Sequence, residues 1–196
     1  MPQFLLIVRE WLRPGSEAAY DANELKIAAA CATLKCPHPY LALVSVDNPR
    51  EVWWLNAFAS SEERDGLDAA YARNDRLMAA LAPLGKRKED FRSAVSTIRA
   101  THRPDVSGQA SVTIAGARFL VVSATKGQDA WPGSAFESAD GDWFRIASAP
   151  AREVAAEIAV QFGSGATVLA VQPRWSFPAE AWIRADPDFW KSHSTA

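Results

Sequence analysis

The chain has 196 residues, of which 48% are hydrophobic and 22% are charged, a composition typical of globular proteins with one large or two small domains. Its formal net charge of −2 argues against a nucleic-acid-binding surface, because phosphate binding requires concentrated lysine and arginine. No apolar run reaches the ~18 residues of a membrane span, and Met1 leads into an apolar segment without a basic region or cleavage signature. We therefore expect a cytoplasmic protein with no nucleic-acid or membrane partner.

The chain begins with a predicted strand followed by a predicted helix. Residues 4–11 form a nearly continuous apolar run, which is typical of a strand buried on both faces. Ser16 is suited to cap a helix that carries an apolar side, and Pro37 and Pro39 are expected to end it.

A strand–strand–helix unit comes next. Residues 40–46 and 52–58 are predicted strands joined by a turn, so they form a hairpin. Ser60 and Glu63 match the capping box that starts a helix. The helix is expected to end near a proline and a glycine at 83 and 85. Its predicted buried face has 3-4-3 spacing and consists of Leu67, Ala70, Tyr71, Asn74, Leu77, Met78 and Leu81.

A fourth strand over residues 94–102 completes the order β-α-β-β-α-β between residues 3 and 104, which is the ferredoxin-like arrangement. The basic cluster at 86–88 is followed at once by two acidic residues, and is expected to be a solvated helix end. The first and third strands are apolar at both odd and even positions. The far face of the sheet must therefore be covered by a partner subunit or by the second half of the chain.

The second half is expected to form another α+β domain. A linker at 105–110 suggests a division into residues 1–105 and 110–196. The expected elements are a hairpin over residues 111–125, a hairpin over 136–147, a helix over 150–162 capped near Ser148, a strand over 167–171 and a terminal segment from residue 179. This half is rich in tryptophan, and its aromatic residues are expected to make core and interface. Whether it is a degenerate repeat of the first half stays open.

Two strand–helix junctions resemble a known superfamily. They read Val-Arg-Glu-Trp-Leu-Arg-Pro-Gly-Ser-Glu at residues 8–17 and Trp-Leu-Asn-Ala-Phe-Ala-Ser-Ser-Glu-Glu-Arg at 54–64. The first half is thereby similar to the dimeric α/β-barrel superfamily, which includes antibiotic-biosynthesis-type and haem-degrading monooxygenases, muconolactone-isomerase-like proteins and NIPSNAP-like proteins. The resemblance implies two sheets facing each other across a barrel, commonly between subunits, with a small-molecule cavity inside. It therefore implies a homodimer and a small apolar or aromatic ligand.

The resemblance does not extend to a haem site. Haem-degrading members carry an asparagine on the first strand and a tryptophan and a histidine on the second helix. An ungapped alignment of the junctions places Val8, Leu67 and Leu77 near these positions. Without an axial imidazole, haem ligation is disfavoured, so we expect no cofactor.

Few residues are candidates for chemistry or binding. His102 ends the fourth strand and is the candidate general acid or base, although a solvent-facing position is the alternative. The candidate ligand-binding residues are Trp54, Asn56, Tyr71 and Arg9. Asn56 shares a face with Trp54, and a backbone group, a buried water or a ligand must satisfy its amide. Arg9 can pair with a nearby glutamate, Glu51 or Glu10, or hold an acidic ligand.

Cys31 and Cys36 are the only cysteines. They are too few for a disulfide framework or a tetrahedral zinc site, so no metal is expected. Structural thiols are expected, and redox chemistry is the alternative.

Two functions remain open. The first is a small-molecule site inside a barrel, where catalysis of the cofactor-independent monooxygenase or isomerase type would place a polar residue such as His102, Asn56 or Tyr71 in an enclosed cavity. The second is a non-catalytic binding or assembly module, in which tryptophan and leucine fill that space.

Overall fold

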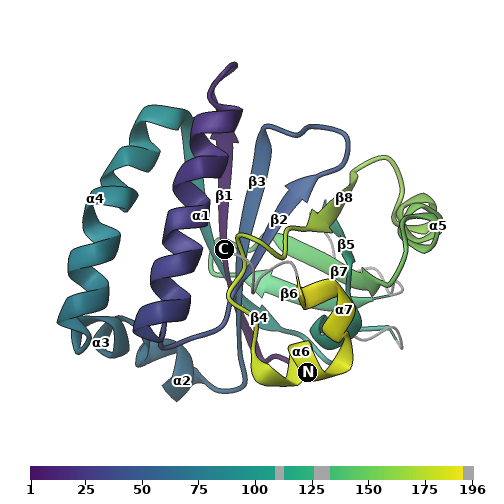
Figure 1. Cartoon of the computed structure of the whole chain (residues 1–196). Coiled ribbons are helices and arrows are strands. Elements are labelled where there is room, and N and C mark those ends of the chain that lie inside the picture. Colours follow the sequence, from purple (N-terminus) through teal and green to yellow (C-terminus); the bar gives the residue numbers. More distant parts are fainter. Residues whose placement is uncertain (109–112, 126–132, 192–196) are drawn as a thin grey trace.

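Eight strands close into one barrel within a single chain (Figure 1). The computed structural model describes residues 1–108, 113–125 and 133–191. Around the barrel the strands follow the order β1-β3-β2-β8-β5-β7-β6-β4. Their bounds are β1 (Phe4–Leu12), β2 (Leu41–Ser45), β3 (Glu51–Phe58), β4 (Arg92–His102), β5 (Phe119–Thr125), β6 (Ser134–Ser138), β7 (Trp143–Ala149) and β8 (Ala166–Val171).

The first half has the ferredoxin-like arrangement that the sequence predicts. Its strands lie in the order β4-β1-β3-β2, and all pairings among them are antiparallel. Helices α1 (Glu17–Leu34) and α4 (Asp75–Phe91) stand side by side on the outside of the barrel (Figure 1). They pack on the outer face of β1 and β3 through a cluster that includes Leu12, Tyr20, Val52 and Phe91.

The second half repeats this strand order. Its strands lie in the order β8-β5-β7-β6, again antiparallel, which is the same sequence of first, second, third and fourth strands as in the first half. The predicted β6–β7 hairpin is confirmed, with Gly141 at φ +80° in its turn. Helix α5 (Arg152–Phe162) covers this half on the side of the barrel opposite to α1 and α4 (Figure 1).

The two halves cover each other. Strand β2 pairs with β8, and β4 pairs with β6, so the first half's far sheet face is covered by the second half of the same chain. The sequence allows either a partner subunit or the second half of the chain to cover this sheet face, and in the structure the second half covers it. A homodimer stays a prediction, but closing the barrel does not require it.

The inside of the barrel is filled by apolar side chains. Every strand except β6 and β4 contributes at least two residues to this core, and α7 (Pro187–Trp190) adds Trp190, which is 2% exposed. The buried members are Leu5, Ile7, Leu41, Leu43, Trp53, Leu55, Ala100, Ile114, Ala117, Leu120, Val122, Phe136, Phe144, Ile146, Leu169, Val171 and Trp190. The aromatic-rich terminal segment, α6 (Glu180–Ala185) with α7, thus docks onto the barrel of its own chain.

The single helix predicted after Ser60 is wrong. Ser60 does cap a helix, but that helix, α2 (Ser61–Asp65), is short and is followed by α3 (Leu67–Ala72) and then α4. Asn74 starts α4 as its N-cap, because its side-chain oxygen accepts a hydrogen bond from the Leu77 backbone N–H at 3.2 Å. Helix α4 then continues through Pro83 as far as Phe91.

Two expectations in the second half also need correction. Residues 113–125 do not form a hairpin: Ile114–Gly116 is a single 3-10 turn, η1, and β5 is one strand that pairs with β7 and β8. Residues 111 and 112 lie outside the described part, as do Trp131 and His193. Helix α5 begins after Ala151 without a side-chain cap, so Ser148 is not its N-cap. Its predicted end at Gly163 is confirmed, at φ +83°.

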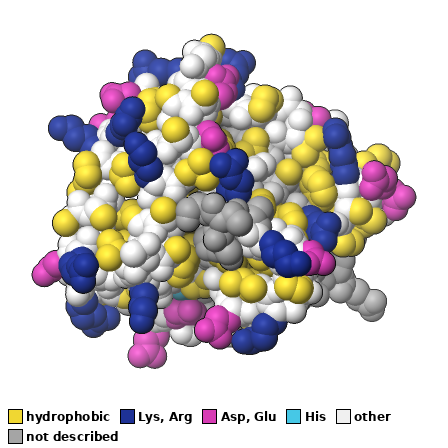
Figure 2. Space-filling model, viewed as in Figure 1, with side chains coloured by type: hydrophobic (Ala, Val, Ile, Leu, Met, Phe, Trp, Pro, Cys, Tyr) yellow, Lys and Arg dark blue, Asp and Glu magenta, His cyan; other side chains and the backbone are white. Residues whose placement is uncertain are grey.

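The surface shows no concentration of one charge on the face drawn in Figure 2, where Lys and Arg side chains alternate with Asp, Glu and apolar ones. Within the described ranges, none of the helices has the length and hydropathy needed to cross a bilayer.

Candidate functional site

Trp53 and Trp54 point to opposite faces of β3, as the alternation of a strand predicts. Trp53 lies in the barrel core, whereas Trp54 faces the helices. At one end of the barrel, Glu51 Oε1 accepts a hydrogen bond from Trp53 Nε1 at 2.8 Å and lies 2.7 Å from Arg9 Nη2. The Arg9 guanidinium also stacks 4.4 Å from the Trp11 ring. Of the pairings considered for Arg9, the structure contains the one with Glu51.

The other predicted site residues lie apart from one another. Asn56 Nδ2 donates to the Pro39 carbonyl at 3.3 Å, so a backbone group satisfies this amide. The Tyr71 hydroxyl lies 2.9 Å from Cys36 Sγ, beneath the helices. His102 lies at the other end of the barrel from Arg9, where its Nε2 is 3.1 Å from Ser107 Oγ. Burial lowers the pKa of His102, which favours the neutral imidazole.

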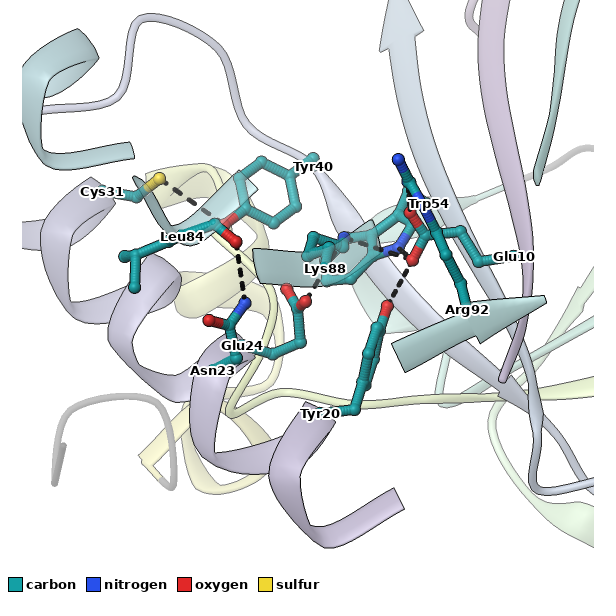
Figure 3. A network of polar contacts seen from close by, with 10 residues as sticks. All are labelled: Glu10, Tyr20, Asn23, Glu24, Cys31, Tyr40, Trp54, Leu84, Lys88 and Arg92. Atoms are coloured by element: carbon teal, nitrogen blue, oxygen red, sulfur yellow. Dashed lines mark hydrogen bonds and ion pairs between the residues drawn. The ribbon is translucent and has the colours of Figure 1, made fainter. Parts of the chain in front are cut away.

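The densest polar cluster lies between the helices and the outer sheet face (Figure 3). At its centre is the Glu10 carboxylate, which is 1% exposed. Tyr20 donates to it from α1, Trp54 Nε1 donates at 3.1 Å, and Arg92 Nη1 lies 2.8 Å away. Burial alone would raise the pKa of Glu10, but the charge of Lys88 and the hydrogen bonds from Tyr20 and Trp54 outweigh it, so the pKa lies below its usual value.

Lys88 links this carboxylate to a second one. Its Nζ lies 3.2 Å from Glu10 Oε2 and 3.3 Å from Glu24 Oε1, and 4.3 Å from the centre of the Trp54 ring. Lys88 belongs to the basic cluster that the sequence places at a solvated helix end, and for this residue the expectation is wrong. The reason is that α4 extends past Pro83, which turns Lys88 towards α1.

Glu24 has a different environment from Glu10. It is 1% exposed, and Lys88 is its one ion-pair partner within the described residues. Burial first, and then the nearby Glu10 charge, raise the pKa of Glu24 to about 7 in spite of Lys88. A carboxyl group that titrates near neutral pH can hold or release a proton. The ion pairs and hydrogen bonds of this cluster join α1 and α4 to β1, so the cluster fixes the two helices on the sheet.

A cleft lies on the outside of the sheet, beside α2 and α3. This cleft has a volume of about 760 Å³ and is lined by β1, β4, β6 and the two short helices. We call it the Arg99 cleft. Its lining consists of Leu5, Leu6, Phe58, Arg64, Asp65, Leu67, Asp68, Arg99, Ala100, Thr101, Arg103, Glu137, Ser138 and Ala139. Apolar and charged side chains therefore meet in one concave surface.

The charges in the Arg99 cleft are mostly paired. Arg64 Nε lies 2.8 Å from Asp65 Oδ1, and Arg103 is paired with Glu137. Arg99 is exposed, and no ion-pair or hydrogen-bond partner for it lies in the described part of the chain. Sequence reasoning missed Arg99, although the alternation of exposed residues on β4 would place it on the outer face.

Solved structures share this fold over most of the chain. A protein described as a "putative monooxygenase" from Fusobacterium nucleatum is 5% identical, with 90% of this chain and 93% of that one covered at a TM-score of 0.54. An anthrone oxidase-like protein is 9% identical, with coverage of 88% and 92% and a TM-score of 0.50. At these identities the likeness concerns the fold alone.

Other neighbours match only about half of the chain. A protein described as a "putative antibiotic biosynthesis monooxygenase" from Bacteroides thetaiotaomicron is 17% identical over 51% of this chain and 89% of its own, with a TM-score of 0.39. A NIPSNAP family protein from Agrobacterium tumefaciens covers 53% of this chain. The neighbours thus include two of the classes of protein that the first half resembles, the antibiotic-biosynthesis-type monooxygenases and the NIPSNAP-like proteins. No family model matches the sequence, and no curated protein does.

Proposed function

We propose that this protein binds a small molecule with an apolar body and an acidic group in the Arg99 cleft, as a binding module rather than an enzyme. The observation that carries the proposal is the exposed Arg99, which has no partner among the described residues and lies in a cleft that also offers apolar side chains. An arginine fork binds a carboxylate or phosphate with two parallel hydrogen bonds, and the planar guanidinium also stacks on flat ligands.

The size and walls of the cleft fit such a ligand. Its volume of about 760 Å³ lies within the range of small-molecule sites. Leu6 and Leu67, which are both partly exposed, provide apolar contact. Asp68 is the other exposed charge in the lining without a partner in the described residues, and it suits a hydroxyl or amine on the same ligand.

Two observations favour binding over catalysis. Tryptophan, leucine and other apolar side chains fill the barrel, which is the outcome expected of a non-catalytic module. The described lining of the Arg99 cleft also contains no histidine, cysteine, tyrosine or lysine. A catalytic role for His102 stays a prediction, and His102 is not part of this lining.

Calorimetric titration with 2-naphthoate and with its neutral counterpart 2-naphthylmethanol tests the proposal. We expect naphthoate to bind more tightly, and Arg99→Gln to weaken its binding about tenfold, equivalent to about 1.4 kcal/mol. Arg76→Gln is the matched control, because Arg76 is exposed on α4 outside the cleft. The proposal is wrong if the wild-type protein binds neither compound, if it binds both equally, or if Arg99→Gln binds naphthoate as the wild type does.

A further inference from the structure

The end of helix α1 brings the two cysteines together. Lys35 adopts the left-handed conformation at φ 57°, and the Cys36 backbone N–H donates to the Cys31 carbonyl at 2.9 Å. In this helix-ending motif, the residue that follows the left-handed residue contacts the side chain four positions before the left-handed residue. Here those side chains are the two thiols, which belong to one buried cluster and lie close enough to influence each other's acidity.

Two tyrosines flank the thiol pair. The Tyr71 hydroxyl lies 2.9 Å from Cys36 Sγ, and the Tyr40 hydroxyl donates to Cys31 Sγ at 3.6 Å. Both cysteines are buried and neither forms a disulfide. Each sulfur atom therefore has a hydroxyl partner in addition to its apolar packing.

A separate cleft lies beside Tyr71. Tyr71, whose hydroxyl contacts Cys36, lines a cleft of about 440 Å³ with Met78 and Leu81. Cys36 is the more exposed of the two cysteines, at 7% against 1% for Cys31. Tyr71 is therefore the residue that links this cleft to Cys36.

The two sulfur atoms differ in acidity. The hydrogen bond from Cys31, together with that from Tyr71, lowers the pKa of Cys36 to about 7 against the opposing effect of burial. The hydrogen bond with Cys36 and burial raise the pKa of Cys31. The C-terminal end of α1 carries a partial negative charge, which disfavours a thiolate. The stabilisation of the Cys36 thiolate therefore comes from these hydrogen bonds.

We propose that Cys31 and Cys36 are a redox-active pair that reduces a small peroxide and becomes a disulfide. The Cys36 thiolate attacks one peroxide oxygen, the O–O bond breaks, and Cys36 becomes a sulfenic acid while the leaving oxygen takes up a proton as water or an alcohol. The Cys31 thiol then attacks the Cys36 sulfur, the S–S bond forms, and the hydroxyl leaves with the thiol proton as water. The two thiols lose two electrons, and the peroxide gains them.

Intact-mass analysis after addition of one equivalent of hydrogen peroxide tests the pair. We expect the folded protein to lose the mass of two hydrogen atoms, to resist alkylation once denatured, and to recover two alkylation sites after phosphine treatment. In Cys31→Ser, a cyclic dione should label Cys36 as the trapped sulfenic acid, whereas Cys36→Ser should give no such label. Tyr71→Phe should slow the reaction severalfold while leaving its product unchanged.

The proposal is overturned if both thiols remain alkylatable after peroxide treatment, or if oxidation stops at a sulfenic or higher acid with Cys31 present. It is also overturned if the urea-unfolded chain reacts as fast as the folded one, since the fold would then contribute nothing. The Arg99 cleft is not lined by Cys31, Cys36 or Tyr71, so the result of this experiment is independent of ligand binding in that cleft.

Discussion

Protonation of Glu24 affects the stability of the folded state near neutral pH. Its pKa is raised from 4.5 to about 7, so the folded protein holds this proton more tightly than the unfolded chain does. The resulting stabilisation is complete below about pH 4.5 and is lost as the pH rises towards 7. Glu10, whose pKa is lowered, has the opposite effect and loses its stabilisation as the solution becomes acidic.

Replacing Glu24 with glutamine should remove this dependence, because glutamine resembles the protonated acid. Between about pH 5 and pH 8, we expect the free energy of unfolding of the wild type to fall by about 3 kcal/mol relative to Glu24→Gln, at 1.36 kcal/mol per pKa unit. Urea unfolding at several pH values measures this difference. Glu17→Gln, at an exposed site on the same helix, is the control. Parallel pH profiles for wild type and Glu24→Gln would show that Glu24 titrates normally.

At the scale of elements, Lys88 is the residue that ties α4 to α1 and β1. Its ammonium group lies between Glu10 and Glu24, and its side chain is 14% exposed. Lys88→Met keeps the aliphatic stem but leaves buried carboxylates with less positive charge, so we expect a loss of about 3 kcal/mol in stability. Lys86→Met, at an exposed position of the same helix, should change stability little. Equal unfolding midpoints for the two variants in urea would rule out this anchoring role.

The strands were more predictable than the helices. All four strands of the first half are confirmed to within two residues, because each is an apolar or alternating run bounded by turn residues. The helical segment after Ser60 misled the prediction because Asn74 has spacing that fits a buried face and also a side chain that caps a new helix. Local spacing does not decide between these two roles. The tertiary structure does, because Asn74 Nδ2 donates a hydrogen bond to the Leu34 carbonyl at the end of α1, at 2.9 Å.

The candidate site was less accessible to sequence reasoning for a physical reason. Arg99 is visible as a polar residue on an alternating strand, but its neighbours in the cleft come from α2, α3 and β6. Their meeting depends on the pairing of β4 with β6, which joins residues 100–102 to 136–138 across the two halves. Similarly, the contact between Cys31 and Cys36 required knowing that Lys35 adopts a left-handed conformation.

At the scale of the whole molecule, each half is needed to cover the other. A chain ending after Val106 would lack β5 to β8 and would expose Leu5, Ile7, Trp53 and Leu55 on the inner sheet face. We expect this fragment to aggregate or to self-associate through that face, and to bind a hydrophobic dye that the full chain does not bind. Light scattering and dye fluorescence measure both properties. A monodisperse, cooperatively unfolding monomer would mean that the second half is not an essential cover.

The domain division at 105–110 stays a prediction, as does a degenerate repeat, which the shared strand order of the two halves supports. Whatever the history of the two halves, their different sequences have a consequence for stoichiometry. When two identical chains form a barrel, every site occurs twice, related by the twofold axis. Here the carboxylate cluster belongs to the first half, and the Arg99 cleft lies where β4 of the first half meets β6 of the second, so no twofold axis repeats either of them. A substitution in either of them changes one copy per barrel, and saturation should require one ligand per chain.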